Sequence, residues 1–434
     1  MTKYLAVILF MVAVILIGLS NCTKHDQELD ISTPPVVLQI DTLTSLHVST
    51  VPTLQPIGGS AWDGNIEAAW SNAQKLTVHA VVPDLGNGTF EGYVGNATDI
   101  TMRSLYDASN IYYLVEFNAP QKNVKSAQWY FNPTTHLWAQ EATAYSGTTN
   151  VNSDGSLRPL FAQDQFVIMF NIANSCKTFK ALSCYAGCHV NSAYGGTVIP
   201  EGGVMYTNGP DEFLDVWRAR MLQVVNVNQA NDCFIDWGAG VLNKNEVHGD
   251  LQVNNGPTPI ADGGFTNKQT ITITGKTTKE AIPLWVIAGG VGSTSAGKYS
   301  AIMLSDTLAG GAAVKVMAVD SNGVLTLANS TTIDPRTSAS NTDYQQVGAG
   351  DGPKCVPGSV VAAYTGSRGD VTANAFYTGT GWRLLLKRAL KTNDTVNDVD
   401  FSSLSDQPFG VGAMFNGADN QHAIVAGLTL HFQK

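Results

Sequence analysis

Hydrophobic and polar residues alternate along most of the chain after residue 58, which is the pattern of β-strands with one buried face. The clearest examples are residues 76–81, 100–106, 111–117 and 165–170. Residues 107–110, between two of these segments, have the composition of a tight turn. The first half of the folded region is therefore predicted to consist of β-hairpins.

The same alternation continues in the second half of the chain. It predicts strands at residues 269–274, 284–288, 299–304, 314–318, 324–328, 360–364, 382–386 and 424–432. Helical periodicity is rare, and residues 211–224 are the best candidate for it, as a short helix or turn segment. The pattern predicts an all-β fold, an antiparallel two-sheet β-sandwich with few short helices.

The N-terminal residues have the composition of an export signal. Lys3 precedes an apolar run over residues 5–19, so residues 1–21 are predicted to be a signal peptide. Cys22 lies where bacterial lipoproteins are lipidated; a plain secretory signal or an uncleaved anchor helix is the alternative. Residues 22–56 then form a lipid-anchored linker. Residues 57–432 form the folded domain, in which 265–345 is a Gly/Ser/Thr-rich insertion or a small β-appendage.

Charge and motifs exclude several classes of function. The 434 residues include 25 Lys and Arg against 35 Asp and Glu, a net charge of -10, which argues against nucleic acid and anionic lipid as partners. The chain contains no Gly-rich phosphate loop, no Gly-x-Ser-x-Gly and no His-Glu-x-x-His motif. We expect a non-catalytic protein of the bacterial cell envelope, held by its lipid on the periplasmic side or on the outer membrane surface.

The candidate chemistry lies in Cys184, Cys188 and His189. Two cysteines followed at once by a histidine are typical of covalent haem c attachment, although three residues separate the cysteines here instead of two. The cysteines would bind the porphyrin, and His189 would be an axial iron ligand. The alternatives are a Cys184–Cys188 disulfide and a zinc site that also includes Cys176. Cys233 and Cys355 are a further possible disulfide, with Cys176 as an alternative partner.

Several segments carry a resemblance to a known family. They are residues 57–64 with Trp70, 104–117, 164–170 leading to Cys184, 205–210, 215–218, 381–390, 398–401 and 409–415. Together they resemble the haem-binding domain related to the γ subunit of ethylbenzene dehydrogenase and its c-type cytochrome relatives. The resemblance covers residues 57–240 and 350–432. It implies a two-sheet sandwich that holds one haem and passes electrons.

The resemblance also implies candidates for the second axial ligand. Met205 lies at the place of the family methionine, and His422 at the place of the family lysine; either is able to bind iron opposite His189. Trp217 is a candidate to pack on the porphyrin, or else a core residue. Arg218 is a candidate to pair with a haem propionate, or else a solvated surface charge.

The sequence thus predicts an electron-transfer c-type cytochrome, an exported lipoprotein that serves a redox protein partner, either a dehydrogenase or another cytochrome. The iron would cycle between its ferric and ferrous states, and the protein would set the potential. The alternative is a secreted carbohydrate-binding or structural β-sandwich lipoprotein with a Cys184–Cys188 disulfide.

Overall fold

The computed structural model of the chain describes residues 42–84, 90, 92–141, 162–187, 206–237, 248–249, 262–287, 300–336, 356–415 and 422–434. They belong to one compact unit, Ile40–Lys434. The predicted signal peptide and Cys22 lie outside the described residues. None of the described helices is long and apolar enough to cross a membrane.

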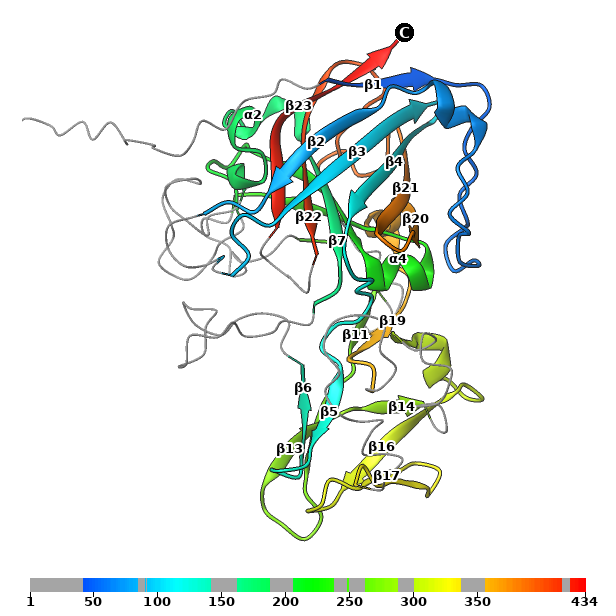
Figure 1. The fold of residues 1–434 in the computed structure, drawn as a ribbon, viewed down its shortest axis with the longest axis vertical. Helices are drawn as coiled ribbons and strands as arrows, with labels where there is room; N and C mark the ends of the chain where they lie inside the picture. The colour runs from blue at the N-terminus through cyan, green and yellow to red at the C-terminus, as the bar shows by residue number, and fades with distance from the viewer. Residues whose placement is uncertain are drawn as a thin grey trace, which may run out of the picture. The chain divides into compact units, whose positions relative to one another are not determined.

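A sheet of twelve strands dominates this unit (Figure 1). Across the sheet the strands are β10 (His248–Gly249), β9 (Asn231–Ile235), β8 (Leu214–Arg220), β7 (Gln165–Asn171), β22 (Gln407–Met414), β23 (Ala423–Gln433), β1 (Thr42–His47), β3 (Ala97–Tyr106), β4 (Asn110–Asn118), β21 (Gly381–Ala389) and β20 (Thr372–Tyr377). Strand β2 (Leu76–Val81) pairs with both β23 and β3. Every pair is antiparallel except those of β1, which runs parallel to β23 and β3.

Local sequence explains the first hairpins. In β2 the side chains of Leu76, Val78 and Ala80 are buried and the intervening ones are exposed, as strict alternation requires. Between β3 and β4 the carboxylate of Asp107 accepts hydrogen bonds from the backbone N–H groups of Ser109 and Asn110, at 2.6 and 2.7 Å. Such a side-chain-to-backbone bond favours a turn, so the turn predicted at residues 107–110 is confirmed.

The two halves of the sheet face each other across one hydrophobic core. The ring of Tyr113 on β4 contacts Trp217 on β8, with centroids 5.7 Å apart, and Phe170 on β7, with centroids 6.3 Å apart. Residues from β2, β3, β4, β7, β8, β21, β22 and β23 join this core. The predicted all-β, sandwich-like fold is confirmed, with β1 as the departure from a fully antiparallel sheet.

Smaller sheets enclose a second core. The described residues form the hairpin β5 (Trp129–Asn132) and β6 (Leu137–Gln140), the pair β12 (Gln269–Thr272) and β13 (Lys279–Ile282), and the sheet β14 (Trp285–Ile287), β16 (Ala313–Val319), β17 (Leu325–Leu327) and β18 (Thr332–Ile333). A fourth small sheet contains β11 (Gly264–Thr266), β19 (Ser359–Val361) and β15 (Ile302–Met303). Trp129, Phe131 and Trp138 pack against Ile282 and Val316, so the hairpin joins this core from outside residues 265–345.

Two segments differ from the sequence prediction. The short helix or turn segment expected over residues 211–224 is wrong for residues 214–220, which form β8; the helix there is α4, Met221–Val227. The buried face of β8 includes Asp215, and a charged residue at a core position hides the alternation of a strand. The folded body also begins before residue 57, because β1 pairs within the sheet.

The remaining helical segments are short. Besides α4, the only α-helix among the described residues is α2 (Phe179–Leu182). The 3-10 helices are η1 (Ala68–Asn72), η2 (Ile172–Asn174), η3 (Ser183–Ala186), η6 (Leu304–Thr307) and η7 (Gly366–Gly369).

Candidate functional site

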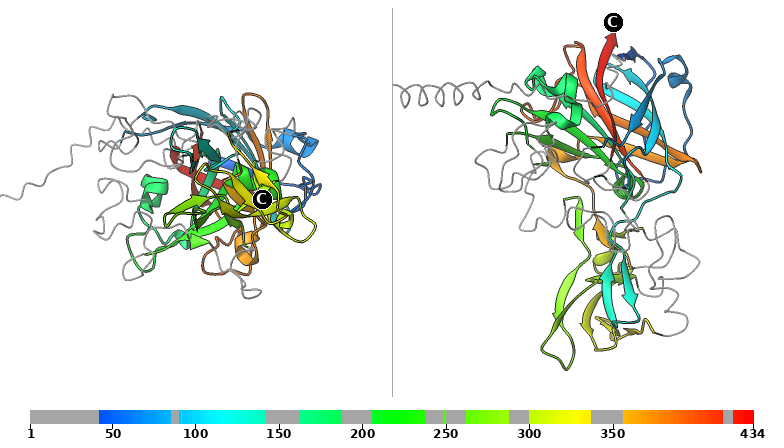
Figure 2. Two further views of the ribbon diagram at one scale, coloured as in Figure 1. Left: turned by 90° about the horizontal axis from the view of Figure 1, so that it is seen from below. Right: turned by 60° about the vertical axis from the view of Figure 1, so that its left-hand side comes forward.

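Cys184 is carried by the helical segments η2, α2 and η3, which follow β7. Asn171 at the end of β7 anchors this connection: its side chain accepts a hydrogen bond from the backbone N–H of Cys176 at 2.9 Å and donates one to the carbonyl of Cys176 at 2.8 Å. Helix α2 and η3 then pack against β22 and β23 (Figure 2). The connection therefore fixes Cys184 over the outer face of these strands.

Glycines on β22 make this close approach possible. Alternation points Phe409 and Val411 into the main core, whereas Gly410 and Gly412 lie on the opposite face. A Cβ atom on Gly410 would collide with the hydroxyl of Ser183, the residue before Cys184. A Cβ atom on Gly412 would lie 3.4 Å from the imidazole of His422. Because these two residues are glycines, η3 and His422 can pack directly against β22.

The central observation is the contact between Cys184 and His422. The Sγ atom of Cys184 lies 3.4 Å from Nε2 of His422, although the residues are 238 positions apart in the chain. Both side chains are partly buried. The rings of Phe90 and Tyr185 flank the imidazole, with centroid distances of 6.0 and 6.5 Å. A thiol and an imidazole nitrogen therefore meet in a partly apolar environment.

The other two described cysteines are held in different surroundings. Cys176 is buried and free, its Sγ lies 3.6 Å from the hydroxyl of Thr178, and burial raises the pKa of its thiol. Cys233 is buried on β9 and its Sγ lies 3.7 Å from the carbonyl of Asn231. Both belong to the hydrophobic cluster under α2, against which Cys184 also packs.

The side chains of Trp217 and Arg218 project from opposite faces of β8. Trp217 is fully buried in the main core, where the guanidinium of Arg388 lies 4.6 Å from its ring centroid. Arg218 pairs in register with Val167, which packs under α2, and its Nε donates to Gln165 at 2.8 Å. Arg218 is thus on the face of the sheet that Cys184 covers, and Trp217 is on the other.

Cys188, His189, Met205 and Cys355 lie outside the described residues. Of the residues expected to bind haem or iron, the structure brings Cys184 and His422 together. Arg388 and the carboxylates around it were missed by the sequence analysis. The available signal was an arginine on the apolar face of the leucine-rich strand at residues 382–388.

Comparison with known proteins assigns the family. The family model described as ethylbenzene dehydrogenase matches residues 67–425. The chain belongs to the ethylbenzene dehydrogenase family. The matched region runs from η1 to β23 and includes both Cys184 and His422.

Solved structures with some likeness to the chain are carbohydrate-binding modules. A family 9 module from Caldicellulosiruptor kristjanssonii in complex with cellotriose has 8% identity and a TM-score of 0.27, over 91% of this chain and 95% of that chain. The same module in complex with glucose has 8% identity and a TM-score of 0.26, over 91% and 97%. At these scores the likeness carries no argument about fold or ligand. No curated protein matches the chain in sequence.

Proposed function

We propose that this member of the ethylbenzene dehydrogenase family is an electron-transfer protein that carries one covalently bound haem c. Its role is to accept and donate single electrons between redox proteins, and it does not transform a substrate of its own. It is exported and held in the bacterial envelope by the lipid on Cys22, so its partner is a dehydrogenase or a cytochrome of that compartment.

The observation that supports this proposal is the contact between Cys184 and His422. The sequence nominates these two residues for different roles, thioether formation and iron ligation. They are distant in the chain, and they meet on one face of β22 at 3.4 Å. The family match spans both of them.

The chemistry of this pair fits a c-type haem. A thiol is the group that forms the thioether, and an imidazole nitrogen is an axial ligand. When bound, haem would supply one-electron exchange at its iron. Cys184 would hold the porphyrin edge and His422 would hold the iron, and the contact between them must open for both to do so.

The neighbouring residues would set how easily the iron is reduced. Phe90 and Tyr185 limit water around His422, and solvent exclusion favours the less charged state of a redox centre. Arg218, on the same face of the sheet, supplies a positive charge able to pair with a propionate. These residues are therefore expected to tune the potential and not to transfer electrons themselves.

The test is expression of the full chain with a cytochrome c maturation system. The purified protein should be coloured, and a denaturing gel stained for haem should show covalent attachment. The Cys184→Ala variant should lose most of this staining, whereas Cys176→Ala, which removes a buried thiol outside the pair, should keep it. A folded, colourless wild-type protein overturns the proposal.

A second variant tests the role of His422. His422→Ala should keep covalent haem but lose the near-infrared magnetic circular dichroism band of its axial ligand set. If the band is the same in the wild type and in His422→Ala, His422 is not a ligand.

A further inference from the structure

Asp164, the residue before β7, is a buried acid that the proposed function does not use. It is 0% exposed. Its Oδ2 accepts hydrogen bonds from Nε1 of Trp382 on β21 at 2.8 Å and from the backbone N–H of Asn123 at 3.1 Å. Its Oδ1 accepts one from Nδ2 of Asn123 at 3.0 Å. Within the described part of the chain, hydrogen bonds and not an ion pair hold this carboxyl group.

The backbone of Asp164 joins the same parts of the fold. Its N–H donates to the carbonyl of Asn123 at 2.9 Å, and its carbonyl accepts from the N–H of Met221, the first residue of α4, at 3.0 Å. Side chain and backbone together tie Asn123 to β7, β21 and α4. We call these contacts of Asp164 with Asn123, Trp382 and Met221 the Asp164 clasp.

The Asp164 clasp lies where the chain leaves the main core and returns to it. Residues 119–128 connect β4 of the main sheet to β5 of the smaller hairpin (Figure 1). Val124 still packs in the main core, whereas Trp129 packs in the second core. The chain enters the main sheet again at β7, directly after Asp164. The clasp therefore joins the two ends of the segment that carries β5 and β6.

The surroundings of Asp164 suit a protonated acid better than a carboxylate. A buried carboxylate without a cation beside it is costly, so burial favours the neutral form. Burial raises the pKa of Asp164 to about 6, although the hydrogen bonds from Trp382 and Asn123 oppose this shift. A protonated carboxyl group is also a donor. Oδ1 of Asn123, on the amide that contacts Asp164, is buried and has no hydrogen-bond partner among the described residues.

The elements packed against Asp164 bring few charged or titratable groups near it. Helix α4 has none. Burial and the charge of Asp164 both raise the pKa of Tyr377 on β20. The others are Lys122 and Lys125 on the connection, Arg220 at the end of β8 and Arg383, which pairs with Glu116, on β21.

We propose that Asp164 is a proton-dependent clasp, closed while its carboxyl group is protonated and loosened when that group ionises. The carboxylate needs water, and water reaches it when the connection separates from β7 and β21. Opening frees the base of the segment that carries β5 and β6, while the strands of the main sheet stay paired. The device is independent of Cys184, His422 and haem.

The direction and size of the pH effect follow from the two states of the clasp. In the open state Asp164 is solvated and its pKa is near the ordinary value of 3.8, whereas in the closed state it is about 6. The ratio of open to closed molecules should therefore rise with pH, by about 50-fold between pH 4 and pH 7, and level off above pH 7.

The experiment is amide hydrogen–deuterium exchange of the full chain, read by mass spectrometry from pH 4 to pH 7 and scaled for the pH dependence of chemical exchange. The N–H groups of Asn123 and Asp164 are both bonded within the clasp, so their protection should fall by about 50-fold over this range. In Asp164→Asn the amide keeps an acceptor oxygen and does not ionise, so protection at Asn123 should not change with pH.

Asp370→Asn is the matched control. Burial and the charge of Asp398 raise the pKa of Asp370 to about 6 as well, but Asp370 follows η7, outside the clasp. This variant removes a second acid that ionises in the same pH range. It should keep the wild-type response at Asn123.

The proposal is overturned if protection at Asn123 in the wild type does not change between pH 4 and pH 7. It is also overturned if Asp164→Asn responds to pH as the wild type does, or if Asp370→Asn abolishes the response. The wild-type profile decides the matter if Asp164→Asn fails to fold.

Discussion

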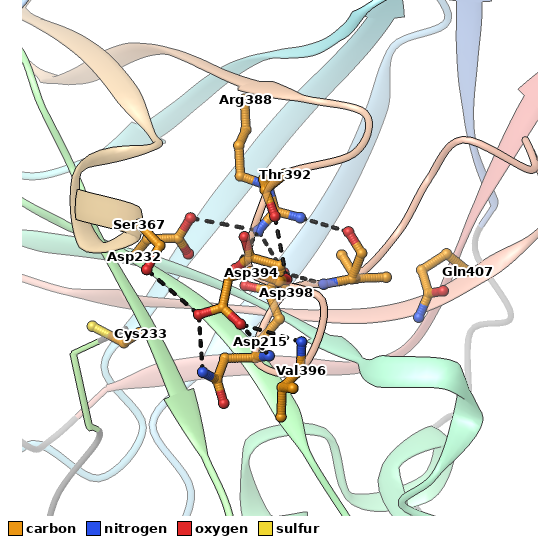
Figure 3. A network of polar contacts seen from close by, with 12 residues as sticks. Asp215, Asp232, Cys233, Ser367, Arg388, Thr392, Asp394, Val396, Asp398 and Gln407 are labelled. Carbon is orange, nitrogen blue, oxygen red and sulfur yellow. Dashed lines mark hydrogen bonds and ion pairs between the residues drawn. The ribbon is translucent and has the colours of Figure 1, made fainter. Parts of the chain in front are cut away.

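Replacing Arg388 by methionine should be among the most damaging single substitutions in the main core. Methionine matches the length of the arginine stem but leaves the buried carboxylates of Asp215, Asp232 and Asp398, which lie 2.7, 3.5 and 3.2 Å from Nη1 of Arg388, without their guanidinium (Figure 3). Removing one partner of a buried ion pair costs about 3–5 kcal/mol. The variant also loses the hydrogen bond to Val399, worth about 1 kcal/mol, and the cation–π contact with Trp217.

We therefore expect Arg388→Met to lower the free energy of unfolding by about 4 kcal/mol or more, a large part of the roughly 5–15 kcal/mol that a folded domain has. The measurement is urea unfolding followed by far-ultraviolet circular dichroism. Arg388→Lys, which keeps the charge but not the forked contacts, should lose less.

Arg383→Met on the same strand is the matched control. Arg383 pairs with Glu116 at 2.9 Å, and both side chains are partly exposed, at 26% and 37%. An exposed ion pair is worth about 0–1 kcal/mol, so this variant should be nearly as stable as the wild type. Equal losses in Arg388→Met and Arg383→Met would refute the view that Arg388 neutralises buried charge.

Two further predictions concern β22 and the pH dependence of stability. Gly410→Ala should lower the free energy of unfolding by about 1–3 kcal/mol, because the new methyl group meets Ser183. Gly209→Ala is the control and should have little effect in the same urea assay, because its new Cβ atom would lie 3.8 Å from the nearest atom of Glu212. Burial raises the pKa of Asp164 from 3.8 to about 6, although Trp382 and Asn123 donate hydrogen bonds to it. The folded state thus favours the protonated acid, and stability should fall by about 3 kcal/mol as pH rises between these two values, at about 1.4 kcal/mol per pKa unit. Asp164→Asn should flatten this part of the curve of urea midpoint against pH; an unchanged slope would show that other groups cause it.

The strands with regular alternation could be predicted from sequence, and the others could not. Strands β2, β3, β4 and β7 bury every second side chain or bury both faces with apolar residues, so their pattern is visible locally. Part of β8 was predicted as helix or turn because an aspartate is normally a surface residue. Asp215 is buried in the core because it forms an ion pair with Arg388. β1 was assigned to the linker because its short sequence carries three Thr or Ser residues, and its two neighbours lie far along the chain.

The candidate site shows the same division between local and non-local information. Cys184 could be nominated from its neighbours in sequence, and His422 from its place in the family resemblance. Their contact depends on the bare face of β22 and on the pairing of β22 with β23, which no local pattern specifies. The network around Arg388 joins three distant segments, so sequence alone offered the arginine but not its partners.

The position of β23 has a consequence for how the chain folds. β23 joins β22 and β7 on one side to β1, β2 and β3 on the other, so it is the strand that unites the two halves of the sheet. Its pairing with β1 connects residues 423–433 to residues 42–47, across almost the whole chain. Contacts of such sequence separation form late and slowly, because a large loop must close first. During synthesis each half of the sheet therefore exposes an unpaired edge until β23 is made, and this interval is when the protein is most open to aggregation and to proteases.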